Sequence, residues 1–470
     1  MTRVLSVTSE CVPLIKTGGL ADVAGALPAA LAPFGVGMRT LLPGYRVVMA
    51  AQGNYAPVVM ELDDLFGGPA RIRRGALGDA VLYILDAPHL FDRDGGPYLA
   101  PDGKDWPDNP QRFAALDKAA ALIARDGIEG WRPQVLHLHD WQAGLTPVYL
   151  RQLGVSGVKC LLTIHNVAFQ GLAPAHMLAA LQLPAHLFTP QGFEYWGRIS
   201  ALKAGIVFSD KVSTVSPTYA EELLTPEFGM GMEGVLADRG ADFIGILNGI
   251  DLKTWTPPFA DLAGKARARA ALRGEFGLAD SAGPLCVVIS RLSEQKGLDL
   301  LIEALPALVE NGGQLAVLGT GDARLENALR DAAARDPASV AVRIGYDEAL
   351  AHRMVAGGDA ILVPSRFEPC GLTQMYGLRF GTLPVVSLTG GLADTVINAS
   401  ASAMAAGVAT GLQFHPVTAQ ALARTLTRLV QLYRQPKLWQ AMVANAMSQP
   451  VGWDASARAY ADLFKAMTTA

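Results

Sequence analysis

LCVVISRL, at residues 285–292, begins the part of the sequence that decides the fold. A helical pattern follows from Gly297 to Glu310, and the alternation of short apolar runs with helical patterns continues to residue 391. The later apolar runs are QLAVLGTG (314–321), VAVRIGY (340–346), AILVPS (360–365) and LPVVSLTGG (383–391). Strands that alternate with helices in this way are typical of βαβ units in a parallel sheet. We therefore expect a doubly wound α/β domain in the second half of the chain.

The first half shows the same alternation less regularly. Its apolar runs are rich in Val, Ile and Leu, which is typical of strands that are buried on both faces of a parallel sheet. These runs are VLSV (4–7), VLHLHDW (135–141), CLLTIHNV (160–167) and KVSTVSP (211–217). Strand character is lost in residues 251–283, which contain Pro257 and Pro258. We expect two Rossmann-like domains, at 1–250 and 284–449, joined by a linker at 251–283. The cleft between them is the expected ligand site.

Composition narrows the classes of partner. The chain has 470 residues, of which 50% are hydrophobic and 17% charged, and its formal net charge is -4. This weak acidic balance argues against nucleic acid or a membrane surface as a partner and is compatible with a neutral polymer. The four cysteines include no C-x-x-C pair, so neither a disulfide framework nor a zinc site is expected. The N-terminal MTRVLSVTSE is not a signal-peptide pattern, which favours a cytoplasmic protein.

Two glycine-rich loops share the sequence TGGLAD. The first lies in KTGGLADV (16–23), where Gly18 and Gly19 let the backbone approach a ligand and Lys16 adds a positive charge at a helix start, which suits a phosphate. This loop matches neither the Walker A nor the G-x-G-x-x-G pattern, which disfavours a nicotinamide cofactor. The second copy is at 389–394. It is either a shared sheet-to-helix turn or a second loop that exposes backbone N–H groups.

Two further stretches carry charge at the ends of expected strands. In SRLSEQKG (290–297), Arg291 and Lys296 could neutralise a pyrophosphate or lie in an ordinary exposed loop. In SRFEPCGLTQMYG (365–377), Glu368 stands in a turn before a helix that begins near Gly371. Its carboxylate could contact a sugar hydroxyl or a developing oxocarbenium charge, or it could cap the helix.

Histidines also stand at strand ends. LHLHDW contains His137, His139 and Asp140, and TIHN contains His165. These side chains either point into a cleft or are satisfied structural residues. No third metal ligand appears at a suitable spacing, and no G-x-S-x-G elbow supports a serine hydrolase.

In sequence order, these motifs resemble the bacterial glycogen synthase and plant starch synthase family of retaining glycosyltransferases. The resemblance spans essentially the whole chain and rests on KTGGLADV, LHLHDWQ, TIHN, NGID, SRLSEQKG, PSRFEPCGLTQMY and TGGLADT. It implies a GT-B fold, in which two Rossmann-like domains face across a deep cleft and the helix in 450–470 crosses back to the N-terminal domain. It also implies a cytoplasmic enzyme that transfers glucose from ADP-glucose to the non-reducing 4-OH of an α-1,4-glucan with retention, without a metal or a cofactor.

The resemblance further implies roles for single residues. Lys16, Arg291 and Lys296 would bind the donor phosphates, Tyr346 would stack on adenine, and Glu368, the first acid of the family's E-x7-E motif, would contact the glucose hydroxyls. The second acid position of that motif holds Tyr376 here, as in the glycogen synthase branch. The implied catalytic residues are Glu368, Arg291, Lys296, His165 and Asp140. The implied donor-binding residues are Lys16, Gly18, Gly19, Asn248, Tyr346, Cys370, Gly371, Leu372 and Thr373, and those near the acceptor or cleft are Glu10, Asp22, Tyr98, Asn109 and Trp141.

Two alternatives remain open at the level of sequence. One is another retaining GT-B enzyme with a different donor or acceptor, such as a UDP-glucose user or a sucrose-type synthase. The other is a catalytically inactive glucan-binding protein, against which the intact set of Lys16, Arg291, Lys296 and Glu368 argues.

Overall fold

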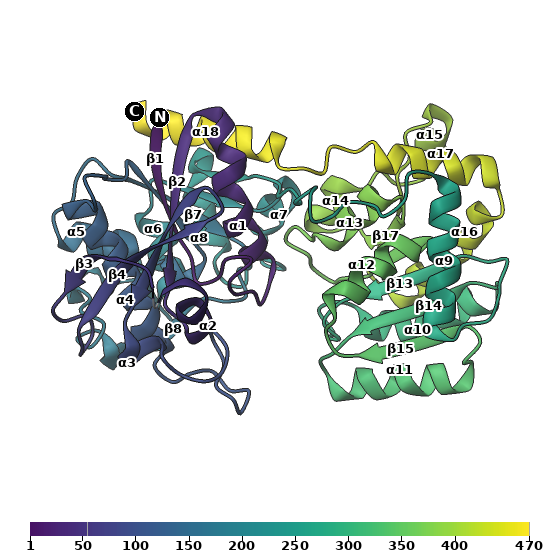
Figure 1. The fold of residues 1–470 in the computed structure, drawn as a ribbon, viewed down its shortest axis with the longest axis horizontal. Helices are drawn as coiled ribbons and strands as arrows, with labels where there is room; N and C mark the ends of the chain where they lie inside the picture. Colours follow the sequence, from purple (N-terminus) through teal and green to yellow (C-terminus); the bar gives the residue numbers. More distant parts are fainter. Residues whose placement is uncertain (54, 470) are drawn as a thin grey trace. The chain divides into compact units, whose positions relative to one another are not determined.

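The computed structural model describes residues 1–53 and 55–469, which form two compact units (Figure 1). Unit 1 comprises Met1–Gly249 and Trp453–Ala470, and unit 2 comprises Ile250–Gly452. Each unit is an α/β sandwich with its own sheet. Among the described residues, no helix is long and apolar enough to span a membrane.

Unit 1 is built on a sheet of nine strands in the order β12-β11-β7-β6-β1-β2-β5-β4-β3. The strands from β12 to β5 pair in parallel, and β4 and β3 add an antiparallel edge. Their bounds are β1 Thr2–Val7, β2 Val36–Pro43, β3 Val58–Leu62, β4 Ala70–Leu77, β5 Ala80–Asp86, β6 Val135–His139, β7 Lys159–Ile164, β11 Lys211–Thr214 and β12 Phe243–Gly245. A separate small sheet contains β8 Leu172–Pro174, β9 Glu194–Tyr195 and β10 Arg198–Ser200.

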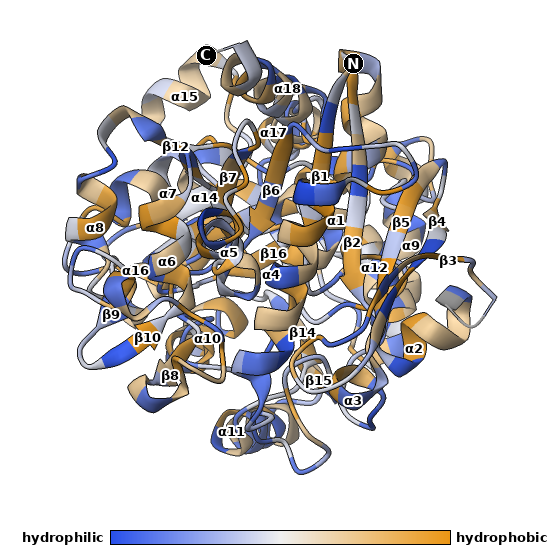
Figure 2. Cartoon of the chain, turned by 90° about the vertical axis from the view of Figure 1, so that its left-hand side faces the viewer, coloured by the Kyte–Doolittle hydropathy of each residue, from blue (hydrophilic) through white to orange (hydrophobic). Residues whose placement is uncertain are grey.

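The principal helices of unit 1 cover this sheet. They are α1 Gly19–Leu31, α4 Asn109–Asp126, α5 Thr146–Gln152, α6 Ala201–Phe208, α7 Pro217–Glu222, α8 Glu233–Ala237 and α18 Asp454–Thr469, with the short α2 Arg46–Val48 and α3 Pro88–Phe91. Apolar colour follows the central strands β2, β5 and β6 in Figure 2, as expected for strands that are covered on both faces. The C-terminal helix α18 packs against α1 and buries Tyr460 and Phe464 in the unit 1 core.

Unit 2 contains six parallel strands in the order β15-β14-β13-β16-β17-β18. The strands are β13 Leu285–Ile289, β14 Gln314–Gly319, β15 Val340–Ile344, β16 Ala360–Val363, β17 Leu383–Ser387 and β18 Leu412–Phe414. The helices are α9 Leu262–Phe276, α10 Leu298–Val309, α11 Ala323–Arg335, α12 Glu348–Gly357, α13 Thr373–Phe380, α14 Gly390–Thr395, α15 Ala401–Ala406, α16 Ala419–Tyr433 and α17 Pro436–Met447. This βαβ repetition confirms the expected doubly wound domain.

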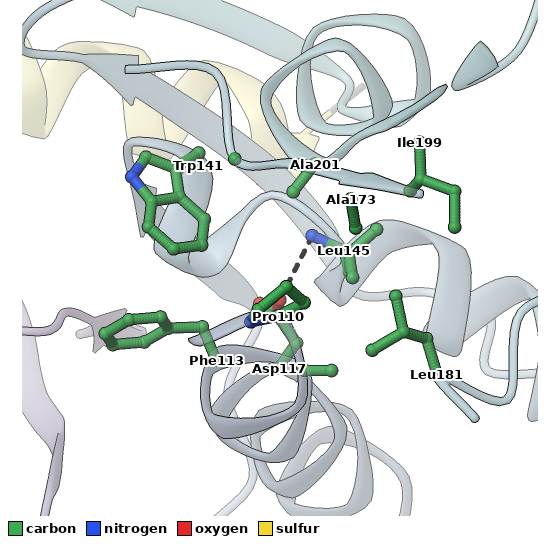
Figure 3. Close-up of a pocket in the computed structure, with 11 residues that line it drawn as sticks. Pro110, Phe113, Asp117, Trp141, Leu145, Ala173, Leu181, Ile199 and Ala201 are labelled. Atoms are coloured by element: carbon green, nitrogen blue, oxygen red, sulfur yellow. Dashed lines mark hydrogen bonds between the residues drawn. The ribbon is translucent and has the colours of Figure 1, made fainter. Parts of the chain in front are cut away.

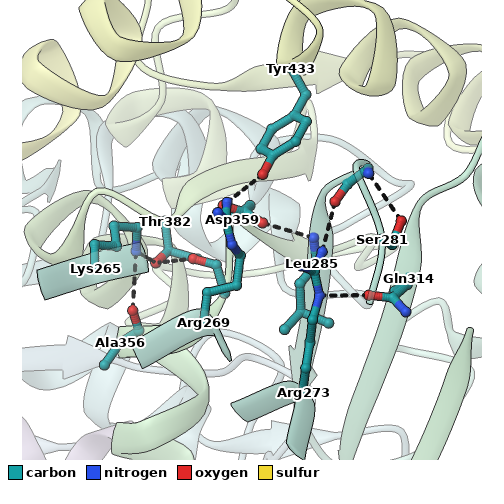
Figure 4. A network of polar contacts seen from close by, with 12 residues as sticks. Lys265, Arg269, Arg273, Ser281, Leu285, Gln314, Ala356, Asp359, Thr382 and Tyr433 are labelled. Atoms are coloured by element: carbon teal, nitrogen blue, oxygen red, sulfur yellow. Dashed lines mark hydrogen bonds and ion pairs between the residues drawn. The ribbon is translucent and has the colours of Figure 1, made fainter. Parts of the chain in front are cut away.

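The expected linker at 251–283 is wrong, because this segment belongs to unit 2. It contains α9, whose Leu272 lies in the unit 2 core. Three basic side chains on α9, Lys265, Arg269 and Arg273, bind groups at the start of the strands (Figure 4). Prolines and a basic run resemble a linker in sequence, but here the long basic side chains reach polar groups at the amino ends of the strands.

Both sheets reverse their strand order at one place. In unit 2 the order changes between β13 and β16, and in unit 1 between β1 and β6. The loops that leave two such neighbouring strands run to opposite faces of the sheet, which opens a crevice at the carboxyl ends. The residues that follow these four strands therefore form a candidate site in each unit.

Candidate functional site

In unit 1, the glycine loop after β1 is organised by the carboxylate of Glu10. Glu10 is buried, and its oxygens accept hydrogen bonds from the backbone N–H of Thr17, from Thr17 Oγ1 at 2.6 Å and from the Gly18 N–H at 3.2 Å. Lys16 Nζ lies 2.8 Å from Asp22 Oδ1 on the first turn of α1. Gly18 is the N-cap of α1 and Gly19 its first residue, and the N-cap has no side-chain hydrogen bond. A carboxylate thus occupies part of the loop in which the sequence predicts an anion site.

Glu10 is itself held by a chain of buried polar groups. The Tyr98 hydroxyl donates to Glu10 Oε1 and lies 2.7 Å from Ser9 Oγ. Burial, with the nearby Glu10 charge, raises the pKa of Tyr98 well above its usual value. Asn109 Nδ2 donates to the Tyr98 carbonyl at 3.0 Å, and the fully buried Arg112 donates to Asn109 Oδ1 at 2.7 Å. These contacts bring four of the residues implied by the resemblance, Glu10, Asp22, Tyr98 and Asn109, to or beside one loop.

The β6 and β7 ends bring Asp140 and His165 together. Asp140 has a φ of 55°, and its Oδ1 accepts the backbone N–H of His165 at 2.6 Å and that of Asn166 at 3.3 Å. Burial raises the pKa of Asp140 to about 7, although these two hydrogen bonds act in the opposite direction. Because the carboxylate engages the backbone, it fixes the position of the His165 main chain.

The buried His139 fixes the ring of His165. His139 Nδ1 lies 2.9 Å from His165 Nε2, and His139 Nε2 lies 3.1 Å from Ser6 Oγ. Burial lowers the pKa of His165 to about 3 and also lowers that of His139, so both rings are neutral. Whichever ring donates, Nε2 of His165 is occupied by His139. The ring atom that remains to face a ligand is therefore Nδ1.

Trp141 and Asn248 take different positions in unit 1. The Trp141 ring packs edge-on against Phe113 at 4.9 Å and covers Gly171, where a Cβ would come within 2.4 Å of the ring. Trp141 also lines a cavity of about 10 Å³ (Figure 3), which has room for about one water molecule and is too small for a sugar. Asn248 is buried, and its Oδ1 has no hydrogen-bond partner among the described residues. This amide oxygen is therefore an unused acceptor within unit 1.

In unit 2, the central feature is an ion pair between the ends of β13 and β16. Lys296 Nζ lies 2.6 Å from Glu368 Oε2, which also accepts the Ser365 hydroxyl at 2.8 Å. Both charged side chains are largely buried. Arg291 follows the same strand as Lys296, is exposed, and makes no ion pair with any residue that the structure describes. One cation is therefore held on a carboxylate and a second is available to an anion.

The loop after Glu368 ends at the start of α13. Gly371 has a φ of 70°, and Gln374 Nε2 donates to the carbonyls of Cys370 and Gly371 at 3.0 and 2.9 Å. Leu372 is the N-cap, Thr373 is the first helical residue, and no side chain caps this end. The alternative that Glu368 caps the helix is therefore wrong. The helix start leaves backbone donors after β16, which is the neighbour of the strand that Lys296 follows.

The second TGGLAD copy has a structural role that the first does not share. Its Gly391 N–H donates to the carbonyls of Glu368 and Pro369, both at 3.2 Å. A Cβ at Gly390 would lie 2.1 Å from the Glu368 carbonyl oxygen, and one at Gly391 would lie 2.2 Å from that of Cys370. A Cβ at Gly18 in the first copy meets no atom within 4 Å. The second copy supports the Glu368 loop by close packing, as expected for a sheet-to-helix turn.

Two tyrosines of unit 2 lie apart from the ion pair. Tyr346 follows β15 and is 73% exposed. Tyr376, which stands at the second acid position of the E-x7-E motif, stacks on Trp255 at 3.5 Å, and Trp255 stacks in turn on His352 at 3.9 Å. The position that carries an acid in the wider group is thus occupied by an aromatic stack.

Sequence reasoning missed several supporting residues. Ser365, Ser6 and Arg112 each bind a residue of the candidate site, but a serine in a strand and an arginine in a helix carry no signal of their own. Ser6 and His139 are 133 positions apart, so no local pattern could have paired them. Among the described residues, no group of three or more His, Cys, Asp or Glu could hold a metal ion.

Family models match both halves of the chain. Residues 3–238 match the model described as starch synthase catalytic domain, and residues 275–449 match glycosyl transferases group 1. The chain is 78% identical to a glycogen synthase of Paracoccus denitrificans, over 99% of this chain and 100% of that protein. It is 57% identical to a glycogen synthase of Cereibacter sphaeroides, over 98% of each.

Solved structures show the same relationship. The catalytic domain of starch synthase IV from Arabidopsis thaliana, bound to ADP and acarbose, is similar with a TM-score of 0.87 and 31% identity over 100% of both chains. A sucrose-phosphate synthase from Thermosynechococcus elongatus shares the fold alone, with a TM-score of 0.63 and 19% identity over 100% of both chains. The fold is therefore GT-B, and the chain belongs to the family of bacterial glycogen synthases and starch synthases.

Proposed function

We propose that this chain is a glycogen synthase that transfers glucose from ADP-glucose to the non-reducing 4-OH of an α-1,4-glucan with retention of configuration. The observation that carries the proposal lies at the unit 2 switch point, where Lys296 pairs with Glu368 and where Arg291 and the start of α13 follow the two neighbouring strands β13 and β16. The identity with named glycogen synthases across essentially the whole chain supports the same activity.

The cations at this switch point would stabilise the leaving group. Negative charge grows on the diphosphate as the glycosidic bond breaks, and fixed positive groups lower the energy of that state. Arg291 would bind the diphosphate directly, and Lys296 would exchange part of its contact with Glu368 for a phosphate oxygen. The backbone N–H groups at Thr373 add the positive end of a helix dipole. Lys16, which pairs with Asp22 beside Gly18 and Gly19, would supply a further cation.

Glu368 would act on the sugar rather than on the phosphates. Its carboxylate accepts hydrogen bonds readily, so it suits the glucose hydroxyls and the positive charge that develops on the ring. Tyr376 packs on Trp255, so this motif supplies no second carboxylate as a nucleophile. We therefore propose that the acceptor 4-OH attacks from the face of the departing ADP and passes its proton to a phosphate oxygen.

Unit 1 would hold the glucose and the acceptor. We assign two groups of His165 to the transferred glucose. They are the ring atom Nδ1 and the main chain, which Asp140 fixes. Glu10, Tyr98, Asn109 and Trp141 are assigned to the acceptor side, Asn248, Cys370 and Leu372 to the donor, and Tyr346 to the adenine. The ADP and acarbose bound by the Arabidopsis relative support an adenine nucleotide donor and a glucan acceptor. Action without a metal and a cytoplasmic location stay predictions from the sequence.

The activity is tested by measuring nucleoside diphosphate release from ADP-glucose and from UDP-glucose, each with and without glycogen. We expect glycogen-dependent release with a strong preference for ADP-glucose. Glu368→Gln should lower kcat by about 100-fold or more, because a group that acts on the developing charge is lost. Glu310→Gln, a change of an exposed glutamate at the C-terminal end of α10, should leave kcat unchanged. Release from neither donor, or an unchanged Glu368→Gln enzyme, would contradict the proposal.

A further inference from the structure

Three large apolar side chains stand exposed in unit 1, two of them at turns and one in the loop that follows β7. Trp196, at the tip of the β9–β10 hairpin, is 86% exposed, Phe169 is 54% exposed, and Met230 is 39% exposed. Tyr195 precedes Trp196 and lies edge-on to it, with 6.5 Å between ring centroids. Because exposed aromatic groups that gather at one place usually mark a binding surface, we refer to Phe169, Tyr195, Trp196 and Met230 as the Trp196 platform.

The backbone at both turns holds these side chains outward. Trp196 has a φ of 49° and is followed by Gly197 at 76°, while Met230 has a φ of 50° and is followed by Gly231 at 84°. A bulky residue rarely adopts positive φ, and a hairpin turn of this kind ordinarily carries Asn, Asp or Gly at the first position. The Trp196 side chain is exposed, so burial of the ring does not offset the energetic cost of this conformation. Unfavourable local choices of this kind are expected at functional sites.

Hydrogen bonds tie the two turns into one rigid surface. The Met230 carbonyl accepts the Tyr195 hydroxyl at 3.1 Å and Gln170 Nε2 at 3.0 Å. A Cβ at Gly231 would lie 2.1 Å from the Tyr195 hydroxyl oxygen, so glycine is required for this contact. The hairpin is closed by a hydrogen bond from the Gly197 N–H to Glu194 Oε1 at 2.6 Å. The platform is therefore preorganised, and binding would cost little conformational entropy.

The platform is continuous with the candidate site of unit 1. Phe169 follows His165 by four residues, and its N–H donates to the Asn166 carbonyl at 3.2 Å. Further along the same loop, the Gln170 and Gly171 carbonyls accept the N–H groups of Leu202 and Ala201 at the start of α6. One short, fixed segment thus links the loop that carries His165 to the exposed aromatic side chains.

We propose that the Trp196 platform binds a glucan chain and holds the polymeric acceptor of the reaction. This inference rests on the proposed function for the identity of the polymer. The C–H face of a pyranose ring packs well on an indole, and the ring hydroxyls can reach backbone carbonyls at the edge of the turns. The carboxylates of Glu194 and Glu233 accept backbone N–H groups at these turns, and Arg198 follows the Trp196 turn in the chain. The surface has no excess of positive charge, which argues against an anionic lipid or nucleic acid.

The test compares Trp196→Ala with the full-length wild type in native gels that contain glycogen. Retardation by glycogen requires binding but no turnover, so it reports the platform even if the proposed activity is absent. We expect Trp196→Ala to weaken the apparent affinity for glycogen about tenfold, as truncation of a binding tryptophan usually does. Trp196→Phe should recover most of the affinity, and Tyr55→Ala, at an equally exposed aromatic residue of unit 1, should bind as the wild type does.

Kinetics with two acceptors separate the platform from the reaction centre. In Trp196→Ala, the KM for glycogen should rise about tenfold relative to wild type, with kcat at saturating glycogen retained. The KM for ADP-glucose, measured with maltotriose as the acceptor, serves as the check on folding.

The inference would be overturned if glycogen retarded Trp196→Ala as strongly as the wild type, or if kcat fell with an unchanged KM for glycogen. Self-association that Trp196→Ala abolishes, with glycogen binding intact, would overturn it in favour of a second copy of the chain. A wild-type protein that binds glycogen through Trp196 but releases no nucleotide would refute the proposed function alone.

Discussion

His137 lies fully buried on β6, between Thr163 and the aromatic rings of α18. Its Nε2 is 2.7 Å from Thr163 Oγ1, its Nδ1 has no partner among the described residues, and the Tyr460 ring centroid is 5.3 Å away. Burial lowers the pKa of His137 from 6.5 to about 3. Between these two pH values the unfolded chain binds a proton that the folded chain does not. The stability contributed by this neutral ring is therefore complete above pH 6.5 and is lost as the pH falls toward 3.

In the His137→Phe variant, position 137 binds no proton in either the folded or the unfolded chain. We expect the free energy of unfolding of unit 1 to fall less steeply with decreasing pH in the variant, by up to about 1.4 kcal/mol per pH unit between pH 6.5 and 3. Urea unfolding at several pH values measures the slope, which is independent of any constant packing change. Asp140, whose pKa is raised to about 7, acts in the opposite direction in both proteins and cancels in the comparison. Parallel slopes would refute the assignment.

At the scale of an element, α9 is attached to unit 2 by side chains that extend to the amino ends of the strands. Arg269 lies 3.0 Å from Asp359 Oδ1, and Asp359 Oδ2 accepts the Leu285 N–H at 2.9 Å at the start of β13 (Figure 4). Asp359→Ala leaves the buried Leu285 N–H without its acceptor and removes the carboxylate partner of Arg269, whose guanidinium still donates to the Tyr433 hydroxyl. Because Arg269 is partly exposed, we expect a loss of about 2–3 kcal/mol rather than the full cost of breaking a buried pair.

Chemical denaturation monitored in unit 2 measures this loss. Glu61→Ala provides the control, because it removes the exposed and long Arg71–Glu61 pair at 3.9 Å in unit 1 and should have no measurable effect. Equal losses in the two variants would mean that the α9 attachment does not depend on Asp359.

At the scale of the whole molecule, the chain enters unit 2 at Ile250 and returns to unit 1 at Trp453. Phe464 on α18 is fully buried in unit 1, and Leu308 on α10 is fully buried in unit 2. Lost burial and a residual cavity should lower the free energy of unfolding by about 3–5 kcal/mol in Phe464→Ala and by about 2–5 kcal/mol in Leu308→Ala. Hydrogen exchange should therefore show reduced protection in β1 and β6 for Phe464→Ala, and in β13 and β14 for Leu308→Ala. Loss of protection in the other unit in either variant would contradict a separate core for each unit.

Local patterns in the sequence predict the strands of unit 2 but not its long-range contacts. The apolar runs at 285–292, 314–321 and 360–365 became β13, β14 and β16, because a strand buried on both faces must be apolar along its length. The stretch 251–283 was misread because composition does not show what long basic side chains reach. The two copies of TGGLAD have identical letters but different roles, since one meets Glu10 and the other the Glu368 loop.

The α/β class, the order of strands and helices in unit 2 and, through motifs in a fixed order, the family all follow from the amino-acid sequence alone. These features are local or cumulative, so they can be read without knowing which segments touch. Only the tertiary structure decided that β13 lies beside β16, which brings Lys296 to Glu368 across 72 positions. It alone paired His139 with His165 and Ser6, and joined the turns at Trp196 and Met230. Such contacts depend on strand order and on the closing of long loops, and no residue carries a local signal for a partner so distant in the chain.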